Sequence, residues 1–547
     1  MIIYNNVKIA RNIMQKIEIS LIYPNIESLL KSENGEGRPN ISNEVLDELE
    51  LNNIIDLKNS FLGDFFTTDI DVIKYRQEVF ADMMENPQLC EILMKASPIL
   101  ADIAEIRRMS QDTEPSEGYL YSITEVELYV SAMELLADGL YPMIDNFKSS
   151  ALVSFAKRIK ELTQSEYYIN LNKKLKELTS RVREVKSVTI GVNLDSRLRP
   201  DTAGVLSVNN ERFKSGVLLE KILRLDFKND EYTCISSLIP FKKGQSDNQQ
   251  IALTNAFNGA LNEVFKSSMR SWRKTLQSYV LENADFLIKL LPEIEFVVKG
   301  TELITILKQT GNPICFPKLS AMEEKKFDVK GIYNPVVASK IDGLMVENDF
   351  VFDKNGQFYV LSGPNRGGKS VITCAVGLTF ALAQLGLPVP AVSAEISPVD
   401  AIFTHFPTGS EDTIDKGRLG EECARLDEIF TSVTENSLVL LDESLSSTGS
   451  FEGAYIAAEV LSGFSMVRCR GIFSTHLHEL SAMIGDINEK CSAQGGAMID
   501  TLVAGIEDGQ RSFKIRRAKP DGKSYAKDIA DKYGISLEHI LEKINKK

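Results

Sequence analysis

The strongest constraint in this sequence is a glycine-rich stretch that lies between a short apolar run and a longer one. The spacing G-x-x-x-x-G-K-S begins at Gly363 and ends at Ser370. The apolar run at 358–361 predicts a buried strand, and the run at 371–385 predicts a core-facing helix. Glycines let successive backbone N–H groups point at phosphate oxygens, and the N-terminus of the following helix adds a favourable dipole. We therefore predict a phosphate-binding loop in which Lys369 reaches the outer phosphates and Ser370 offers a hydroxyl to Mg²⁺.

The alternative interpretation is a chance glycine-rich turn, which the strand-like and helix-like flanks disfavour. The candidate nucleotide-binding residues are Gly363, Pro364, Asn365, Arg366, Gly367, Gly368, Lys369, Ser370 and Val371.

The bulk properties predict a multidomain protein without a membrane segment. A chain of 547 residues with 43% hydrophobic residues is too long for one core, so we expect three or more domains. Its seven cysteines are scattered and never spaced C-x-x-C, which argues against a disulfide framework or a zinc site. No signal-peptide pattern and no run of eighteen apolar residues occurs. We expect a cytoplasmic protein.

The formal net charge of −14 argues against a surface that binds nucleic acid everywhere. An acidic protein can still hold DNA in a basic channel, because affinity depends on the phosphates neutralised there. Any DNA binding is therefore expected to be local.

The middle of the chain predicts two long helices that flank a β-like insertion. Tyr168, Leu171, Leu175, Leu178, Val182 and Val185 recur at alternating spacings of 3 and 4, and a second helical pattern runs over 251–290. Residues 187–194 are β-like, 200–204 turn-like and 205–208 a possible return strand. The insertion at 187–245 holds nine Lys and Arg against seven Asp and Glu, which permits phosphate contacts but equally suits a solvated tip.

Proline and glycine clusters predict the boundary between the helical region and the C-terminal part of the chain. Leu291-Pro292 and Gly311-Asn312-Pro313 are expected to break the helical region, and alternating strand and helix patterns from about Ala321 predict an α/β domain. The predicted division is 1–110 helical core, 111–186 core and descending helix, 187–245 tip, 246–320 returning helix and core, and 321–547 α/β domain.

Two more strand ends carry candidate catalytic residues. The apolar run 438–441 predicts a buried strand that ends in Asp442, a candidate Mg²⁺ ligand, and Glu443, a candidate base or water-positioning residue. A third strand, 471–474, leads to His476, which could hydrogen-bond a γ-phosphate. The pair His476 and His478 also fits a zinc interpretation, which is disfavoured because no third ligand lies at the usual spacing.

These motifs together resemble the MutS family of DNA mismatch-repair ATPases. Their order is typical of that family: the loop 363–370, the segments 389–391 and 394–404, then 438–443, 475–480 and 523–530. A looser likeness covers 68–93.

The resemblance implies a multidomain α and α/β fold, with a helical core and lever region, a small β-containing tip and a C-terminal ABC-type P-loop ATPase domain. It also implies a homodimer formed through the ATPase domains, a clamp that holds duplex or branched DNA, and ATP and Mg²⁺ as ligands. By the same likeness, Lys369, Glu443 and His476 are catalytic, Ser370 and Asp442 bind the metal, and Tyr333-Asn334-Pro335 lies where the family approaches adenine.

Three departures from the family pattern limit this expectation. About fifty residues precede the core, too few for a mismatch-reading domain. Gly417 stands where the family has a serine-rich signature, so Arg418 or backbone N–H groups would have to act in its place. Arg366 replaces a usual Met and could contact phosphate or point to solvent. Two alternatives to a DNA clamp therefore stay open: a non-catalytic, ATP-gated dimeric scaffold, and an ABC-type ATPase that acts on a protein or ribonucleoprotein.

Overall fold

The computed structural model of the chain is mixed helical and α/β. It describes residues 19–111, 118–184, 186–194, 196, 200–209, 211–212, 214–215, 233–234, 283–341, 343–364, 366–406, 417–445, 447–507, 510–518, 539–540 and 544. The chain forms two compact units, Met1–Ile19 with Glu91–Ile294 and Ser20–Cys90 with Glu295–Lys547. The five-part division expected from the sequence remains a prediction.

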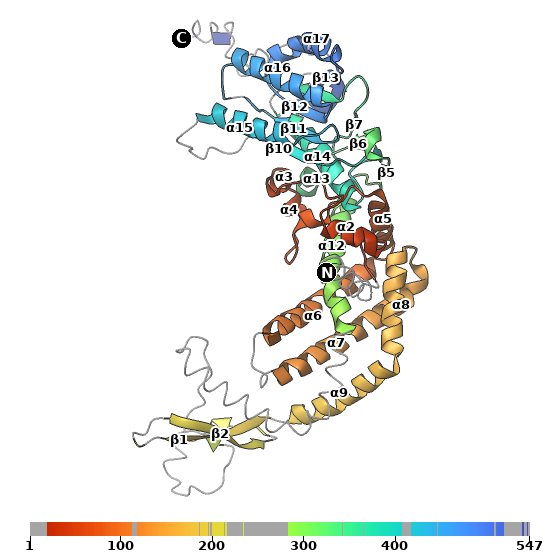
Figure 1. Cartoon of the computed structure of the whole chain (residues 1–547), viewed down its shortest axis with the longest axis vertical. Helices are drawn as coiled ribbons and strands as arrows, with labels where there is room; N and C mark the ends of the chain where they lie inside the picture. The colour runs from red at the N-terminus through yellow and green to blue at the C-terminus, as the bar shows by residue number, and fades with distance from the viewer. Residues whose placement is uncertain are drawn as a thin grey trace, which may run out of the picture. The chain divides into compact units, whose positions relative to one another are not determined.

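The first unit consists of long helices followed by a β-hairpin (Figure 1). An ion-pair network stabilises the helices, because Arg107 contacts both Glu125 and Asp285, which lie on three different helices. The elements are α6 (Pro87–Gln111), α7 (Gly118–Leu140), η2 (Tyr141–Asn146), α8 (Ser150–Gln164), α9 (Glu166–Glu184), β1 (Ser187–Leu194), β2 (Pro200–Asn209), β3 (Lys214–Ser215), β4 (Thr233–Cys234) and the start of α12 (Asn283–Gln309).

The helix and the hairpin predicted at 168–208 are confirmed, with one correction. Helix α9 buries Tyr168, Leu171 and Leu175 as its spacing requires. The stretch 200–204 was predicted as a turn but belongs to β2, which pairs antiparallel with β1 from Leu194↔Pro200 onwards. Proline is tolerated at the first position of a strand, where the missing N–H disrupts no ladder, so the local turn signal was misleading.

The predicted break at Pro292 is also wrong. Helix α12 continues through Pro292, with Leu291 and Ile294 buried on either side, so packing of the apolar face outweighs the lost backbone hydrogen bond. The helix ends before Gly311, which has φ 74°. Of the second helical pattern, predicted over 251–290, residues 283–290 are confirmed as the start of α12, and 251–282 lie outside the described residues.

The second unit is built on a six-stranded sheet with the order β10-β11-β12-β8-β13-β14. The first five strands are parallel neighbours, and β14 is antiparallel to β13. The strands predicted at 358–361, 438–441 and 471–474 are confirmed. Their bounds are β8 (Phe358–Ser362), β10 (Ile402–His405), β11 (Leu438–Asp442), β12 (Arg470–Ser474), β13 (Ile499–Glu507) and β14 (Gln510–Arg517).

Helices cover both faces of this sheet (Figure 1). Val439 and Leu441 pack into a core with α15 (Gly417–Ser432), α16 (Ser450–Val467) and α17 (His478–Ser492). Leu440 points the other way, against Gly377 of α14 (Lys369–Leu385), because side chains alternate along a strand. Buried on nearly every side, α14 begins directly after the glycine-rich loop.

A smaller sheet and several short helices complete the second unit. The smaller sheet has the order β5-β9-β6-β7, with β5 (Lys318–Leu319), β6 (Phe327–Ile332), β7 (Asn348–Val351) and β9 (Ser393–Ile396). The remaining helical elements are α2 (Ile26–Glu33), α3 (Asn43–Glu48), α4 (Leu51–Ile54), η1 (Leu62–Phe65), α5 (Ile70–Glu85), η3 (Met322–Glu324) and α13 (Pro335–Lys340).

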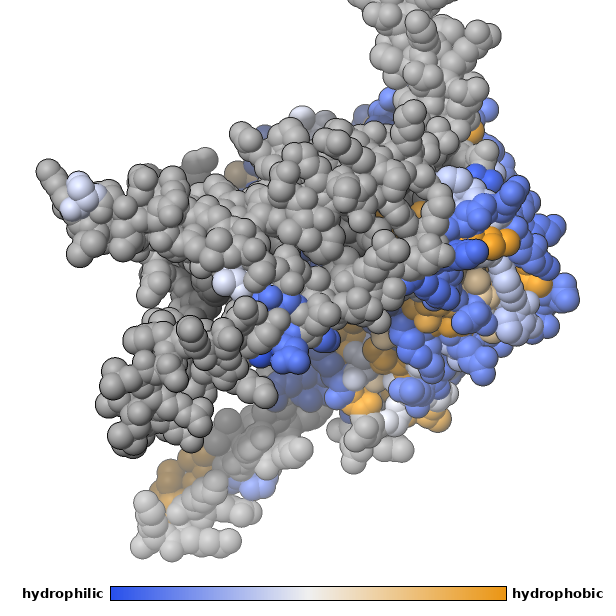
Figure 2. All heavy atoms as spheres, turned by 90° about the horizontal axis from the view of Figure 1, so that it is seen from below, coloured by the Kyte–Doolittle hydropathy of each residue, from blue (hydrophilic) through white to orange (hydrophobic). Residues whose placement is uncertain are grey.

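Within the described ranges, no helix combines the length and the apolar character needed to cross a bilayer. The coloured surface in Figure 2 is mostly hydrophilic, with hydrophobic residues in small separate areas.

Candidate functional site

The site forms at the edge of the large sheet where three parallel strands end. Register pairs Asp442 of β11 with Ser474 of β12, and Ser474 with Leu361 of β8. The chain that follows each of these strands therefore leaves the sheet at the same edge, where ligands bind in open parallel sheets. This geometry brings together the loop after β8, Glu443 after β11 and His476 after β12.

Backbone shape explains the glycines of the loop. Gly363 has φ 145°, and a Cβ there would lie 2.7 Å from the Cβ of Ala504. Gly368 has φ 91° and directly precedes α14, whose first residue is Lys369. Only glycine adopts such angles without strain, so the loop curls tightly onto the N-terminus of a 17-residue helix.

Lys369 folds back over this loop. Its side chain is buried, and Nζ donates to the backbone oxygens of Gly363 at 3.2 Å and Pro364 at 3.4 Å. Nζ also lies 3.1 Å from Nε2 of His476. Burial lowers the pKa of Lys369, while the carboxylates of Glu443 and Asp442 act in the opposite direction. The loop thus encloses a cation that is only partly neutralised by its surroundings.

His476 connects Lys369 to Glu443. The same Nε2 atom lies 2.8 Å from Oε1 of Glu443. Glu443 has φ 50°, and its N–H donates to the backbone oxygen of Ser474 at 2.8 Å. An ammonium, an imidazole and a carboxylate therefore converge beside a curled loop, which is a suitable arrangement for stabilising and attacking a phosphoryl group.

Asp442 and Ser370 offer further oxygen atoms at this site, and their side chains are hydrogen-bonded to each other. Burial raises the pKa of Asp442, although hydrogen bonds from Ser370 and Ser474 oppose that rise. Oδ1 of Asp442 is buried and has no hydrogen-bond partner among the described residues. An unpaired carboxylate oxygen beside a serine hydroxyl fits Mg²⁺, which prefers oxygen ligands and keeps several waters or phosphate oxygens.

A cavity of about 500 Å³ opens beside the loop. Glu443, Lys369 and Ser370 are among its lining residues, and most of the remaining wall is apolar. Tyr333 lines this wall with its ring buried, and burial raises the pKa of its hydroxyl, which has no partner within the described ranges. The other lining residues are Ile332, Asn334, Val337, Ile341, Leu344, Met345, Val346, Asn348, Arg366, Gly368, Val371, Ile372 and Phe513.

Comparison with known proteins gives two family matches. The model described as MutS domain V matches residues 359–525, and the model described as MutS2 N-terminal domain matches residues 68–310. The DNA mismatch repair protein MutS of Prochlorococcus marinus (strain MIT 9301) is 29% identical over 314 residues, which are 55% of this chain and 33% of that protein. The DNA mismatch repair protein MutS of Methanothrix thermoacetophila is 33% identical over 215 residues, which are 38% of this chain and 24% of that protein. The DNA mismatch repair protein MSH6 of Arabidopsis thaliana is 36% identical over 194 residues, which are 35% of this chain and 14% of that protein.

The chain belongs to the MutS family. The resemblance predicted from the motifs is therefore confirmed. This MutS-family chain spans a third or less of the length of these three relatives.

The structure describes most of the predicted site residues of this MutS-family chain. Pro364, Gly367 and Val371 lie in or beside the loop, and Arg366 is exposed on the cavity rim with φ 61°. Asn365 lies outside the described residues. Gly417 begins α15, but the side chain of Arg418 is not among those described.

The zinc interpretation gains no support. No group of three His, Cys, Asp or Glu that could hold a metal ion occurs in the described part of the chain, and the side chain of His478 lies outside it.

Sequence reasoning missed Phe513 of β14. It has φ 55°, and its Cδ1 atom lies 3.5 Å from where a Cβ on Gly368 would be. Asn348 stabilises the backbone around Phe513. Its Nδ2 donates to the Phe513 backbone oxygen at 3.2 Å, and its Oδ1 accepts from the N–H of Ile515 at 2.7 Å. No spacing pattern links residues 348 and 513 to a loop at 363–370, so only the folded sheet identifies them.

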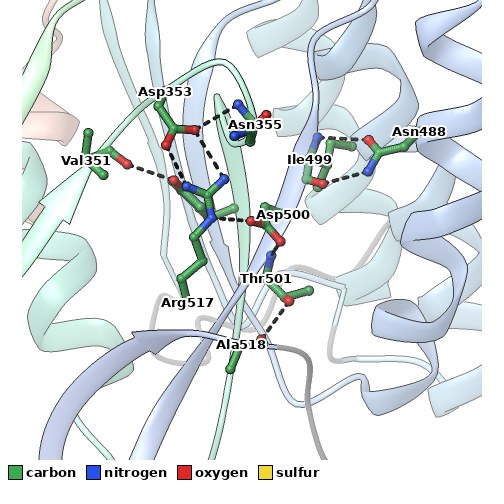
Figure 3. Close-up of polar contacts among 10 residues, drawn as sticks. Val351, Asp353, Asn355, Asn488, Ile499, Asp500, Thr501, Arg517 and Ala518 are labelled. Atoms are coloured by element: carbon green, nitrogen blue, oxygen red, sulfur yellow. Dashed lines mark hydrogen bonds and ion pairs between the residues drawn. The ribbon is translucent and has the colours of Figure 1, made fainter.

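An ion-pair cluster anchors the end of β14, the strand that carries Phe513 (Figure 3). Arg517 binds both carboxylate oxygens of Asp353, at 2.7 and 3.2 Å, and also contacts Asp500 of β13. Its guanidinium lies 5.6 Å from the ring centre of Tyr359 in β8. These contacts hold the end of β14 to Asp353 and to its neighbours in the sheet.

Proposed function

We propose that the chain binds ATP with Mg²⁺ and hydrolyses it in an ABC-type P-loop ATPase domain. The observation that carries this proposal is the convergence of Lys369, His476 and Glu443 beside the glycine-rich loop. Each follows a different one of three parallel strands in one sheet, and the edge where such strands end is where nucleotides bind in these folds.

The γ-phosphate would lie among these three side chains. Backbone N–H groups of the loop and the N-terminus of α14 bind the phosphates, and Lys369 offsets their charge. Glu443 orients the attacking water, and His476 contacts the γ-phosphate. Ser370 and Asp442 would hold Mg²⁺, which neutralises charge as it builds up on the phosphate oxygens.

The cavity would take the adenosine. Its apolar wall and the exposed aromatic ring of Phe513 suit a purine, which stacks on aromatic side chains.

We further propose that ATP hydrolysis controls a grip on DNA by a dimer of this chain. The MutS and MSH relatives are named as DNA mismatch repair proteins, and the family match over residues 68–310 covers the predicted lever and tip. Because the chain spans a third or less of those relatives, mismatch recognition is not part of the proposal.

Two measurements test the two parts of this proposal. The first is the steady-state rate of ATP hydrolysis with Mg²⁺ over a range of protein concentrations. A rate per chain that rises with concentration supports sites completed by dimerisation, and absence of hydrolysis contradicts the enzyme assignment.

The second is gel-shift binding to duplex, mismatched and branched DNA at two salt concentrations, with and without ATP. Salt-sensitive binding to any of these DNAs supports the clamp, because phosphate contacts release counterions. No binding to any of them contradicts it and favours a protein or ribonucleoprotein partner, which suits the net charge of −14.

A further inference from the structure

A second histidine lies close to Glu443 from the opposite side. His405 ends β10, the strand next to β11, and its side chain is buried. Its Nδ1 atom lies 2.6 Å from Oγ of Ser444, the residue directly after Glu443. The hydroxyl of Ser444 also donates to the backbone oxygen of His405 at 3.2 Å. His405 and Ser444 therefore form a buried polar contact between β10 and the turn after β11.

That turn has an unfavourable backbone that needs support from outside. Glu443 and Leu445, on either side of Ser444, have φ of 50° and 62°. Residues other than glycine rarely adopt this left-handed backbone region, and such angles persist only where surrounding contacts impose them. The bond from the Glu443 N–H to Ser474 supplies one contact, from β12. His405 supplies the matching contact from β10.

The contact between Nδ1 of His405 and Oγ of Ser444 can form with either ring tautomer, because a neutral ring nitrogen donates or accepts and a hydroxyl can do both. Burial and, to a smaller extent, the nearby Arg425 lower the pKa of His405 to about 4, so the ring is neutral near pH 7. Hydrogen bonding to the backbone of Glu422, in α15, opposes this shift. The contact between His405 and Ser444 therefore joins two groups that are both neutral near pH 7.

We propose that His405 is a positioning residue for ATP hydrolysis, acting through Ser444 to hold Glu443 in its left-handed turn. This inference rests on the proposed function, because it concerns the step that Glu443 performs there. His405 acts on the geometry of the attacking water and not on the binding of the nucleotide. Loss of its contact should lower the hydrolysis rate while leaving nucleotide affinity unchanged.

A matched pair of substitutions separates the hydrogen bond from simple packing. The amide of His405→Asn is attached at the same carbon as Nδ1 and can still reach Ser444, whereas that of His405→Gln corresponds to Nε2 and cannot. In single-turnover ATP hydrolysis, we expect His405→Asn to keep a rate within about threefold of the unchanged chain. We expect His405→Gln and Ser444→Ala to be roughly tenfold to a hundredfold slower, because small misplacements of a reacting group are costly.

Two further measurements exclude a general structural effect. The Kd for a fluorescent ATP analogue should stay the same in all three variants. In a Glu443→Gln background, His405→Gln should add no further loss of rate, because both changes act on one carboxylate. Ser465→Ala is the control, since it also removes a buried serine hydroxyl that donates to a backbone oxygen, at 2.6 Å, but lies on α16 away from the loop.

Three outcomes contradict the inference: equal rates for His405→Asn and His405→Gln, an unchanged rate for Ser444→Ala, or a further loss in the Glu443→Gln background. If His405→Gln does not fold, the smaller change Ser444→Ala decides alone. If the unchanged chain does not hydrolyse ATP, the proposed function fails instead, so the two failures are distinct.

Discussion

Nζ of Lys369 and Oε1 of Glu443 approach one and the same atom, Nε2 of His476, at 3.1 and 2.8 Å. A neutral imidazole nitrogen either donates or accepts, so Nε2 cannot satisfy both groups at once. If Nε2 accepts from Lys369, it cannot donate to Glu443, and the reverse also holds. His476 therefore stands between two alternative partners, a cation on the phosphate loop and the candidate water-positioning carboxylate.

Lys369→Ala should weaken nucleotide binding. Its ammonium is the buried positive charge of the loop, and a hydrogen bond to a charged group contributes about 1.5–3 kcal/mol, which corresponds to a roughly tenfold to hundredfold higher Kd for ATP. Titration with a fluorescent ATP analogue measures this change in Kd. Lys318→Ala removes the same charge from an exposed pair with Glu395 and should leave Kd unchanged. Equal affinities for the two variants would exclude Lys369 from phosphate binding.

Phe513→Ala should weaken the binding of ATP without affecting that of inorganic triphosphate. The aromatic ring lines the cavity beyond Gly368, and stacking on a base contributes about 1–3 kcal/mol, so the Kd for ATP should rise roughly fivefold to a hundredfold. Competition assays with ATP and with triphosphate measure the two affinities. Phe513→Trp keeps an aromatic surface and should bind ATP nearly normally. A similar loss of affinity for both ligands would mean that Phe513 supports the loop and not the base.

Arg517→Gln should lower stability in a pH-dependent manner. The Arg517 guanidinium holds the pKa of Asp353 below its usual value, so this contribution is fully present above the unfolded pKa of about 4. It is lost as the pH falls through the lower, folded pKa.

Because the pair is partly exposed, we expect a loss of about 1 kcal/mol in unfolding free energy at pH 7, shrinking towards pH 3. Urea unfolding at the two pH values measures this loss, with Lys95→Gln, at an exposed 4.0 Å pair with Glu91, as the control. A loss that grows as the pH falls would contradict the assignment of Asp353.

Local patterns predicted the elements whose signals are local. Apolar runs located β8, β11 and β12, and regular spacing located α9, because the hydrophobic pattern of such segments follows which of their residues are buried. Pro292 and 200–204 were misread for the opposite reason, since tertiary packing and strand pairing outweighed a local breaker signal.

The site shows the same division. Gly363, Lys369, Glu443 and His476 follow strands and Asp442 ends one, so strand prediction was enough to suggest that they meet. Phe513 and Asn348 reach the loop only through the pairing of β13 with β14 and the packing beside β7. His405 was likewise missed, because its partner Ser444 is adjacent only after β10 pairs with β11.

The central claim is that this sheet edge hydrolyses ATP through Glu443. Its most direct test is a comparison of Glu443→Gln with the unchanged chain, measuring the affinity for ATP and the single-turnover rate of hydrolysis on the same preparations. We expect Glu443→Gln to bind ATP with unchanged affinity and to hydrolyse it at least about a hundredfold more slowly, as expected when a group that orients or deprotonates water is removed. Undiminished hydrolysis by Glu443→Gln would contradict the account.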